Sequence, residues 1–96
     1  MLAYWMVYMH VTDPKAYEEY KKRTPAALAK YGGKFLARGG RAQMVEGKRA
    51  PERAVLIEFP SFEQAVKCFN SPEYQEAKGF RTGAAEAQIV IVEGIQ

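Results

Sequence analysis

Arg38 carries a side chain that could bind an anionic ligand. It precedes a glycine pair in the stretch KFLARGG, at the expected end of a short strand. A guanidinium can form two parallel hydrogen bonds with a carboxylate or phosphate, and glycines let the backbone approach a ligand closely. The same pattern is typical of a β-bulge with a charged residue that protects an edge strand. Both interpretations stay open.

His10 and Glu58 are the candidate catalytic residues. His10 is the sole histidine, and imidazole has an ordinary pKa that favours proton transfer near neutral pH. A structural histidine with hydrogen-bonded nitrogens is the alternative. Glu58 interrupts the apolar run AVLIEF, where a carboxylate must be paired or have a shifted pKa. It could act as a general base or form a salt bridge with a lysine or arginine.

Metal, cofactor and thiol chemistry are not predicted. One histidine and one cysteine, far apart and without paired-ligand spacing, do not form a metal site. The stretch GGRAQ lacks the full Gly-x-Gly-x-x-Gly spacing, so we expect no nucleotide-binding loop and no cofactor. Cys68 adjoins Phe69 on an expected helix and is predicted to be a small buried hydrophobe rather than a nucleophile.

A long helix should follow the first strand. Asp13 before Pro14 is typical of a helix start, and Gly32-Gly33 is typical of a helix end. Pro25 falls inside this helix and should kink it near Lys21, because the Lys21 carbonyl loses its usual hydrogen-bond donor.

The remaining elements are predicted from apolar runs that stop at proline or glycine. Ser61, with Gln64 in a capping box, should open a helix that ends near Asn70, and Ser71 should cap a shorter one that ends near 79–83. A polar hairpin arm is expected at 41–53. The expected strands are 2–11, 35–38, 53–59 and 88–93.

This order of elements favours an α+β fold, a ferredoxin-like split βαβ with a four-stranded antiparallel sheet in the order 4-1-3-2. The topology should bring distant polar residues to one end of the sheet, beside His10. The candidate ligand-binding residues are Arg38, Tyr8, Ser71, Tyr74 and Arg81.

Composition narrows the class of protein. The 96 residues should form one domain, 1–96, yet 48% of them are hydrophobic and the strands look apolar on both faces, so we expect a homodimer. The net charge of +3 mixes both signs instead of forming a basic stripe, which argues against nucleic acid. No apolar run approaches the ~20 residues of a membrane span. A single cysteine and the lack of a basic leader favour a cytoplasmic protein.

Four stretches carry a family resemblance: YGGKFLARGG, VLIEFPSFEQA, NSPEYQEAKGFR and IVIVEG. Together they resemble a known bacterial family, the domain of unknown function 1330. The resemblance covers nearly the whole chain and implies a dimeric α/β barrel, in which the sheets of two copies pack together. No activity is established for that family, and its wider superfamily includes cofactor-free monooxygenases, lactone isomerases, haem-handling enzymes and ligand-sensing domains.

Two functional hypotheses follow. In the first, the protein binds or transforms a small anionic or aromatic metabolite: Arg38 anchors the anion, Tyr8 and Tyr74 line the pocket, and His10 or Glu58 moves a proton. In the second, the protein is a non-catalytic dimeric structural or ligand-sensing module, whose polar groups satisfy one another.

Overall fold

The computed structural model describes residues 1–48 and 52–95. Every strand pair in its sheet is antiparallel, and the strand order is β2-β3-β1-β4. Read from the other edge, this is the predicted order 4-1-3-2, so the α+β ferredoxin-like sheet is confirmed. The elements are β1 (Ala3–Val11), α1 (Pro14–Lys30), β2 (Lys34–Arg38), β3 (Arg53–Phe59), α2 (Phe62–Phe69), α3 (Pro72–Gly79) and β4 (Ala85–Glu93).

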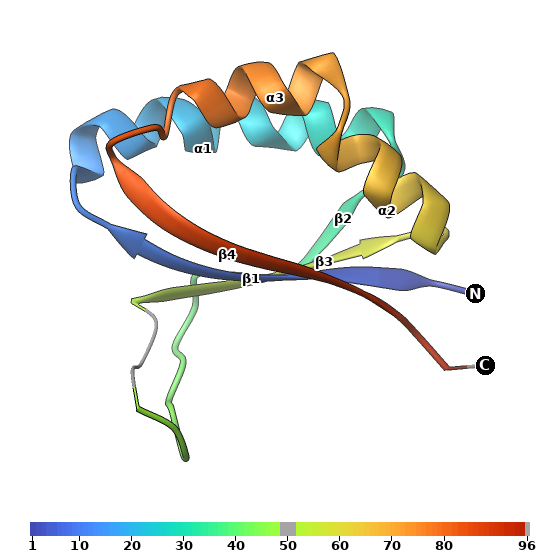
Figure 1. Ribbon diagram of the computed structural model, residues 1–96, viewed down its shortest axis with the longest axis horizontal. Helices are drawn as coiled ribbons and strands as arrows, with labels where there is room; N and C mark the ends of the chain where they lie inside the picture. Colours follow the sequence, from blue (N-terminus) through green and yellow to red (C-terminus); the bar gives the residue numbers. More distant parts are fainter. Residues whose placement is uncertain (49–51, 96) are drawn as a thin grey trace.

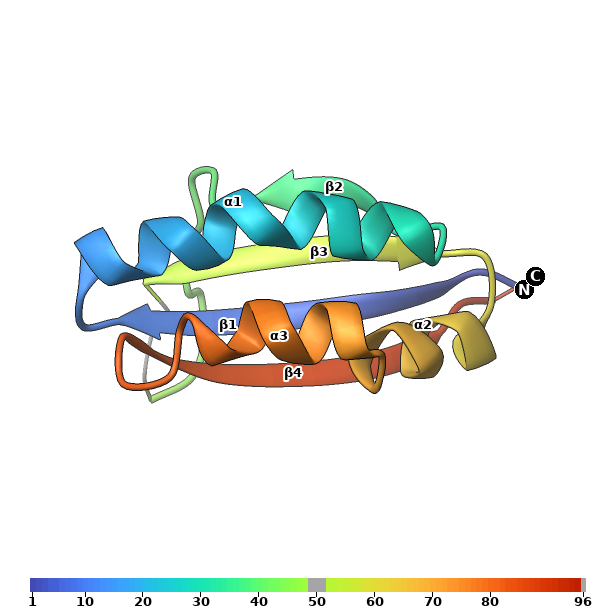
Figure 2. The same ribbon diagram turned by 90° about the horizontal axis from the view of Figure 1, so that it is seen from above.

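All three helices cover the same face of the sheet (Figure 1). Seen from above, α1 lies over the β2–β3 side, and α2 and α3 lie over the side of β4 (Figure 2). The segment between β2 and β3 leaves the sheet on the side away from the helices (Figure 1). It corresponds to the predicted arm, of which residues 49–51 lie outside the described part of the chain.

Helix α1 begins and ends where its sequence signals predict. The Asp13 carboxylate accepts a hydrogen bond from the Ala16 amide at 3.2 Å, as an N-cap does. Gly32 has a φ of +81°, a conformation that glycine adopts without strain, and the Gly33 amide returns to the Leu28 carbonyl. Pro25 lies inside the helix and does not end it.

Both predicted serine N-caps are confirmed, but the capping box predicted between Ser61 and the Gln64 side chain does not form. The hydroxyls of Ser61 and Ser71 accept from the amides three residues on, each at 3.1 Å. The Gln64 side chain does not close a capping box on Ser61, because its amide nitrogen donates to the Tyr31 carbonyl at 3.3 Å. It therefore ties α2 to the end of α1.

Strand β4 is longer than predicted. It begins at Ala85, three residues before the expected Gln88, because its first residues pair with the end of β1, with Val11 opposite Ala85. The Ala84 carbonyl also accepts from the amides of Thr12 and Asp13. Alanine is a weak strand former, so pairing with the long β1 decides where this strand starts.

The sheet has one face in the core and one face without cover from this chain. On the helix side, Trp5 is fully buried, stacks near Phe59 and Tyr74, and donates its indole N–H to the Ala65 carbonyl at 3.1 Å. The opposite face, called the outer face below, carries the alternate residues of each strand. Its apolar members are Tyr4, Met6, Tyr8, Ala37, Ala54, Leu56, Val90 and Val92.

No helix within residues 1–48 and 52–95 is both long enough and apolar enough to cross a membrane.

Candidate functional site

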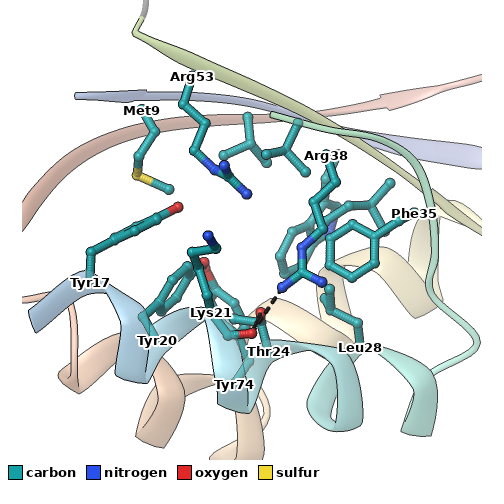
Figure 3. Close-up of a pocket in the computed structure, with 14 residues that line it drawn as sticks. Met9, Tyr17, Tyr20, Lys21, Thr24, Leu28, Phe35, Arg38, Arg53 and Tyr74 are labelled. Carbon is teal, nitrogen blue, oxygen red and sulfur yellow. Dashed lines mark hydrogen bonds between the residues drawn. The ribbon is translucent and has the colours of Figure 1, made fainter. Parts of the chain in front are cut away.

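A cavity of about 30 Å³ lies between α1 and the sheet, enough for about two water molecules. Among the fourteen described residues that line it, none carries a carboxylate or an imidazole. Most are aromatic or aliphatic side chains. The polar ones are all hydrogen-bond donors: Tyr17, Tyr20, Lys21, Thr24, Arg38, Arg53 and Tyr74 (Figure 3).

Three cations surround the mouth of this cavity. Lys21 comes from α1, Arg38 from the end of β2 and Arg53 from the start of β3. The same three line an adjoining open hollow of about 340 Å³, together with Glu18 and Lys22. Lys21 pairs with Glu18 at 3.4 Å, whereas neither Arg38 nor Arg53 forms an ion pair with a described residue. Positive charge therefore exceeds negative charge at the mouth.

A β-bulge aims Arg38 at the cavity. Phe35 lies opposite Ile57 and Arg38 lies opposite Val55, both on the helix side of the sheet, although three residues separate Phe35 from Arg38. In a regular strand, residues three apart point to opposite faces. The irregularity between Phe35 and Ala37 reverses this, and the Arg38 guanidinium then stacks 4.4 Å from the centre of the Phe35 ring.

Arg38 also bridges the mouth to α1. Its Nη2 donates to the Lys21 carbonyl at 2.9 Å, which is drawn as a dashed line in Figure 3. In an ordinary helix that carbonyl accepts from the amide four residues on, but residue 25 is proline and has no N–H. Arg38 thus supplies the donor that Pro25 lacks, and Thr24 adds a longer contact at 3.5 Å.

Gly39 makes room for Arg53. A Cβ at Gly39 would lie 2.1 Å from Arg53 Nη1, and the glycine has a φ of +72°. Arg53 Nε is buried and has no hydrogen-bond partner among the described residues. The space left by the missing side chain of Gly39 is therefore occupied by Arg53 and not by a ligand.

Tyrosines form the deep part of the cavity. Tyr20 and Tyr74 share a buried hydrogen bond of 2.8 Å between their hydroxyls. Burial raises the pKa of Tyr20, with a further contribution from Tyr74, so this phenol stays neutral. Burial likewise raises the pKa of Tyr17, against the lowering effect of Arg53. In Figure 3 the Tyr17 hydroxyl points toward Arg53 and the open centre.

Only some of the site residues predicted from the sequence lie at this cavity. Arg38 and Tyr74 line the cavity, whereas Arg81 contacts Tyr74 and Tyr20 but lines a different hollow. Tyr8 and His10 lie on the outer face, where both line a separate hollow of about 460 Å³. His10 Nδ1 lies 3.1 Å from a Glu52 carboxylate oxygen.

Two further candidates lie away from the cavity. Glu58 is on the outer face, in register with Tyr4 and Lys34. Ser71 is buried, accepts from the Tyr74 amide and donates to the Cys68 carbonyl at 2.6 Å. Its hydroxyl is committed to the junction of α2 and α3.

The expected gathering of Ser71 with His10 at one end of the sheet is wrong. Glu73, in the first turn of α3, contacts Lys30 and Tyr31, which places this turn at the C-terminal end of α1. The reason is that α2 has eight residues, about 12 Å of helix, so the chain has not yet crossed the sheet at Ser71. Helix α3 completes the crossing, and Arg81 follows it.

Lys21, Arg53, Tyr17 and Tyr20 belong to the site but were not among the predicted site residues. Tyr17 and Tyr20 recur at helical spacing with Thr24 and Leu28, and such an apolar stripe also fits a buried helix face. Lys21 carried a signal, since it lies four residues before Pro25. Arg53 precedes Val55 and Ile57 by even steps, so strand alternation places it on the same face.

Cys68 is fully buried, and burial raises the pKa of its thiol to about 12. Its interpretation as a small buried residue is therefore confirmed. Within the described residues, no three side chains of the metal-ligating types His, Cys, Asp or Glu gather closely enough to hold an ion.

Comparison with protein families matches residues 2–95 to a domain of unknown function, DUF1330. The chain belongs to this family. The comparison with curated proteins found no match.

Solved structures share the fold of this DUF1330 protein at low sequence identity. A protein of unknown function from Rhodopseudomonas palustris is 19% identical, with a TM-score of 0.76 over 99% of this chain and 83% of that one. A dimeric ferredoxin-like protein from Jannaschia sp. CCS1 is 13% identical, with a TM-score of 0.69 over 98% and 100%. SnoaB, a cofactor-independent oxygenase from Streptomyces nogalater, is 12% identical, with a TM-score of 0.66 over 99% and 94%. At these identities the likeness shows the fold alone.

Proposed function

We propose that this DUF1330 protein binds a small aromatic anion in the cavity between α1 and the β2–β3 edge. The observation that carries the proposal is the charge of the lining: three cations, with three phenols that can also donate, surround a cavity whose described lining has no carboxylate. Such a lining fits a ligand whose surface consists of hydrogen-bond acceptors. The aromatic walls favour a planar ligand, because rings stack on tyrosine and on guanidinium groups.

Entry of a ligand requires Arg38 to move. The resting cavity of about 30 Å³ is too small for an aromatic ring. The open hollow of about 340 Å³ adjoins it across Arg38, Lys21 and Arg53. Arg38 is exposed, so turning its guanidinium from the Lys21 carbonyl to an incoming carboxylate replaces a neutral acceptor with a charged one.

The proposal concerns binding and not a reaction. SnoaB is described as a cofactor-independent oxygenase, and its likeness to this chain is a fold-level analogy. His10 and Glu58 lie outside the cavity, so the lining offers neither an imidazole nor a carboxylate as a base. The small resting volume is the observation that favours the second hypothesis, a non-catalytic module with a filled cleft.

Titration with benzoate and with benzamide, its uncharged analogue, tests the proposal. We expect calorimetry to detect benzoate binding and little or no benzamide binding. Replacing Arg38 with glutamine should weaken benzoate by about ten- to a hundredfold, the effect of losing a hydrogen bond between charged groups. Arg41→Gln removes the same charge from the exposed segment after β2 and should leave the affinity unchanged. If benzoate and benzamide bind alike, or neither binds, the anion site is refuted.

We also propose that the chain forms a homodimer through its outer face. The apolar residues Leu56, Val90 and Val92 lie on this face, and Val90 and Val92 are 45% and 42% exposed. Exposed apolar patches of this kind mark contact surfaces. The segment between β2 and β3 projects on the same side, where it would flank a second copy (Figure 1). The Jannaschia protein with this fold is described as dimeric.

A further inference from the structure

The hydroxyls of Tyr20 and Tyr74 carry two O–H protons, and the hydrogen bond between them uses only one. One phenol donates to the other across 2.8 Å, and both residues line the cavity. The second O–H has no hydrogen-bond acceptor among the described residues. Arg81, the neighbouring polar group, can only donate. The floor of the cavity therefore presents a buried donor whose acceptor must come from outside the protein.

Arg81 makes this donor electropositive. It is only 8% exposed, its guanidinium lies 5.3 Å from the centre of the Tyr20 ring, and it does not line the cavity itself. Burial lowers the pKa of Arg81, but its contacts with Tyr74 and Tyr20 outweigh this effect and raise it overall, so the guanidinium stays charged.

Nothing in the described chain neutralises that charge. No carboxylate within residues 1–48 and 52–95 forms an ion pair with Arg81, and its Nε is buried without a hydrogen-bond partner. A buried cation without a counter-charge is costly, and an anion bound nearby relieves the cost.

We infer that the Tyr20–Tyr74 pair, backed by Arg81, is an oxyanion-binding site at the floor of the cavity, and that it takes the oxygen of a phenolate or an enolate. This inference rests on the proposed anion cavity and names the class of ligand it holds: a planar hydroxyaromatic or enolised carbonyl compound. A neutral phenol donates to an oxyanion, and a fixed cation behind it strengthens that donation.

The ligand should be ionised by its own acidity. The described lining contains no carboxylate or imidazole that could remove a proton. The site therefore selects the anion, and it lowers the apparent pKa of a bound phenol instead of acting as a base.

The test uses 4-nitrophenol, which ionises near neutral pH and absorbs visible light only as the phenolate. Its absorbance is titrated against pH with and without a saturating concentration of the protein. With the wild type we expect the bound probe to ionise at lower pH than the free one. The double variant Tyr20→Phe/Tyr74→Phe should prefer phenolate over phenol by a factor about ten or more times smaller than wild type. The pKa of the bound probe should therefore move by about one unit toward that of the free probe.

Replacing both phenols leaves neither hydroxyl without its partner, but it also removes the contacts that Arg81 makes with both tyrosines, so folding of the double variant is checked by circular dichroism. If it does not fold, Tyr74→Phe provides the test with a smaller expected shift, since one hydroxyl remains. Tyr8→Phe removes a hydroxyl from the outer face and should behave as wild type.

The outcomes separate the two claims. If the double variant keeps the full preference for phenolate while Arg38→Gln loses affinity, the oxyanion site is refuted and the anion cavity stands. If the wild type binds neither 4-nitrophenolate nor benzoate, both fall.

Discussion

The guanidinium of Arg38 satisfies the Lys21 carbonyl 2.9 Å away, the one that Pro25 leaves without its helical donor. A strand and a helix are thus joined at the cavity mouth by a hydrogen bond that a proline makes necessary. Arg38 therefore has a structural role, the hydrogen bond to the Lys21 carbonyl. It is also the most exposed hydrogen-bond donor of the proposed site. The two roles compete, because the guanidinium cannot serve the carbonyl and a ligand with the same N–H.

A double-mutant cycle between Pro25 and Arg38 should measure this link. Arg38→Ala in the wild type should lower the free energy of unfolding by about 1 kcal/mol, as expected for one exposed hydrogen bond. In a Pro25→Ala background the new amide can serve the Lys21 carbonyl, so Arg38→Ala should cost less. Urea unfolding at matched protein concentration gives the four values. Equal costs in both backgrounds would show that the carbonyl is not what holds Arg38.

The fold was predictable from the sequence because its signals are local. Asp13, Ser61 and Ser71 fix helix starts because their side chains accept hydrogen bonds from the backbone amides three residues on. The order of elements, with right-handed crossovers, then leaves few topologies. The start of β4 was not predictable in this way, because it depends on pairing with β1.

The candidate site was predictable only in part. The loss of the donor to the Lys21 carbonyl follows from Pro25 alone. The arrival of Arg38 depends on a bulge between Phe35 and Ala37, whereas the glycine pair that favoured a bulge in the sequence comes after Arg38. Strand alternation separates Tyr8 from Val7, so Tyr8 could have been excluded from a helix-side cavity. The bounds of α2 were predicted correctly from its caps, so the position of Ser71 could have been inferred: eight residues give about 12 Å of helix, which does not cross the sheet.

Charge introduced on the outer face should separate the proposed dimer. Val90→Glu and Val92→Glu place a carboxylate where two apolar sheets would meet, and a buried unpaired charge is strongly unfavourable. Light scattering should give a dimer mass for wild type and a monomer mass for these variants. Phe62→Glu, which adds the same charge on the helix side, is the control and should stay dimeric. A monomeric wild type at micromolar concentration would rule out the two-sheet barrel.

Stability should fall in acid through Glu73. Its hydrogen bond with Lys30, followed by those from its own backbone and from Tyr31, lowers the pKa of Glu73 to about 2. A carboxyl whose pKa is lower in the folded state stabilises the fold fully above its unfolded pKa of about 4.3. That contribution is lost as the pH falls toward 2.

Comparison of Glu73→Gln with wild type between pH 2 and 6 tests this. The urea midpoint of wild type should exceed that of the variant at pH 6, and the difference should vanish near pH 2. Glu76→Gln, on the same helix and without an ion pair to a described residue, should show no such convergence. A difference that stays constant with pH would remove Glu73 as the cause.

Cys68 should be inert in the native protein. Its thiol is fully buried, and burial raises its pKa to about 12, so very little thiolate exists at pH 8. Labelling by iodoacetamide at pH 8 should be far slower in buffer than in 6 M urea. Equal rates in the two solutions would mean that the α1–α2 packing around Cys68 opens readily.

The position of Arg53 at the mouth of the cavity should depend on a glycine at residue 39 but not on one at residue 40. An alanine at Gly39 would place its Cβ 2.1 Å from Arg53 Nη1 and would also strain a backbone with a φ of +72°. Gly39→Ala should therefore displace Arg53 from the mouth, destabilise the fold by about 1 kcal/mol or more, and weaken benzoate. Gly40→Ala meets no atom within 4 Å and is the matched control, with wild-type stability and affinity expected. If Gly39→Ala loses stability but binds benzoate as tightly as the control, Arg53 has no part in holding the anion, and Lys21 and Arg38 would have to hold it alone.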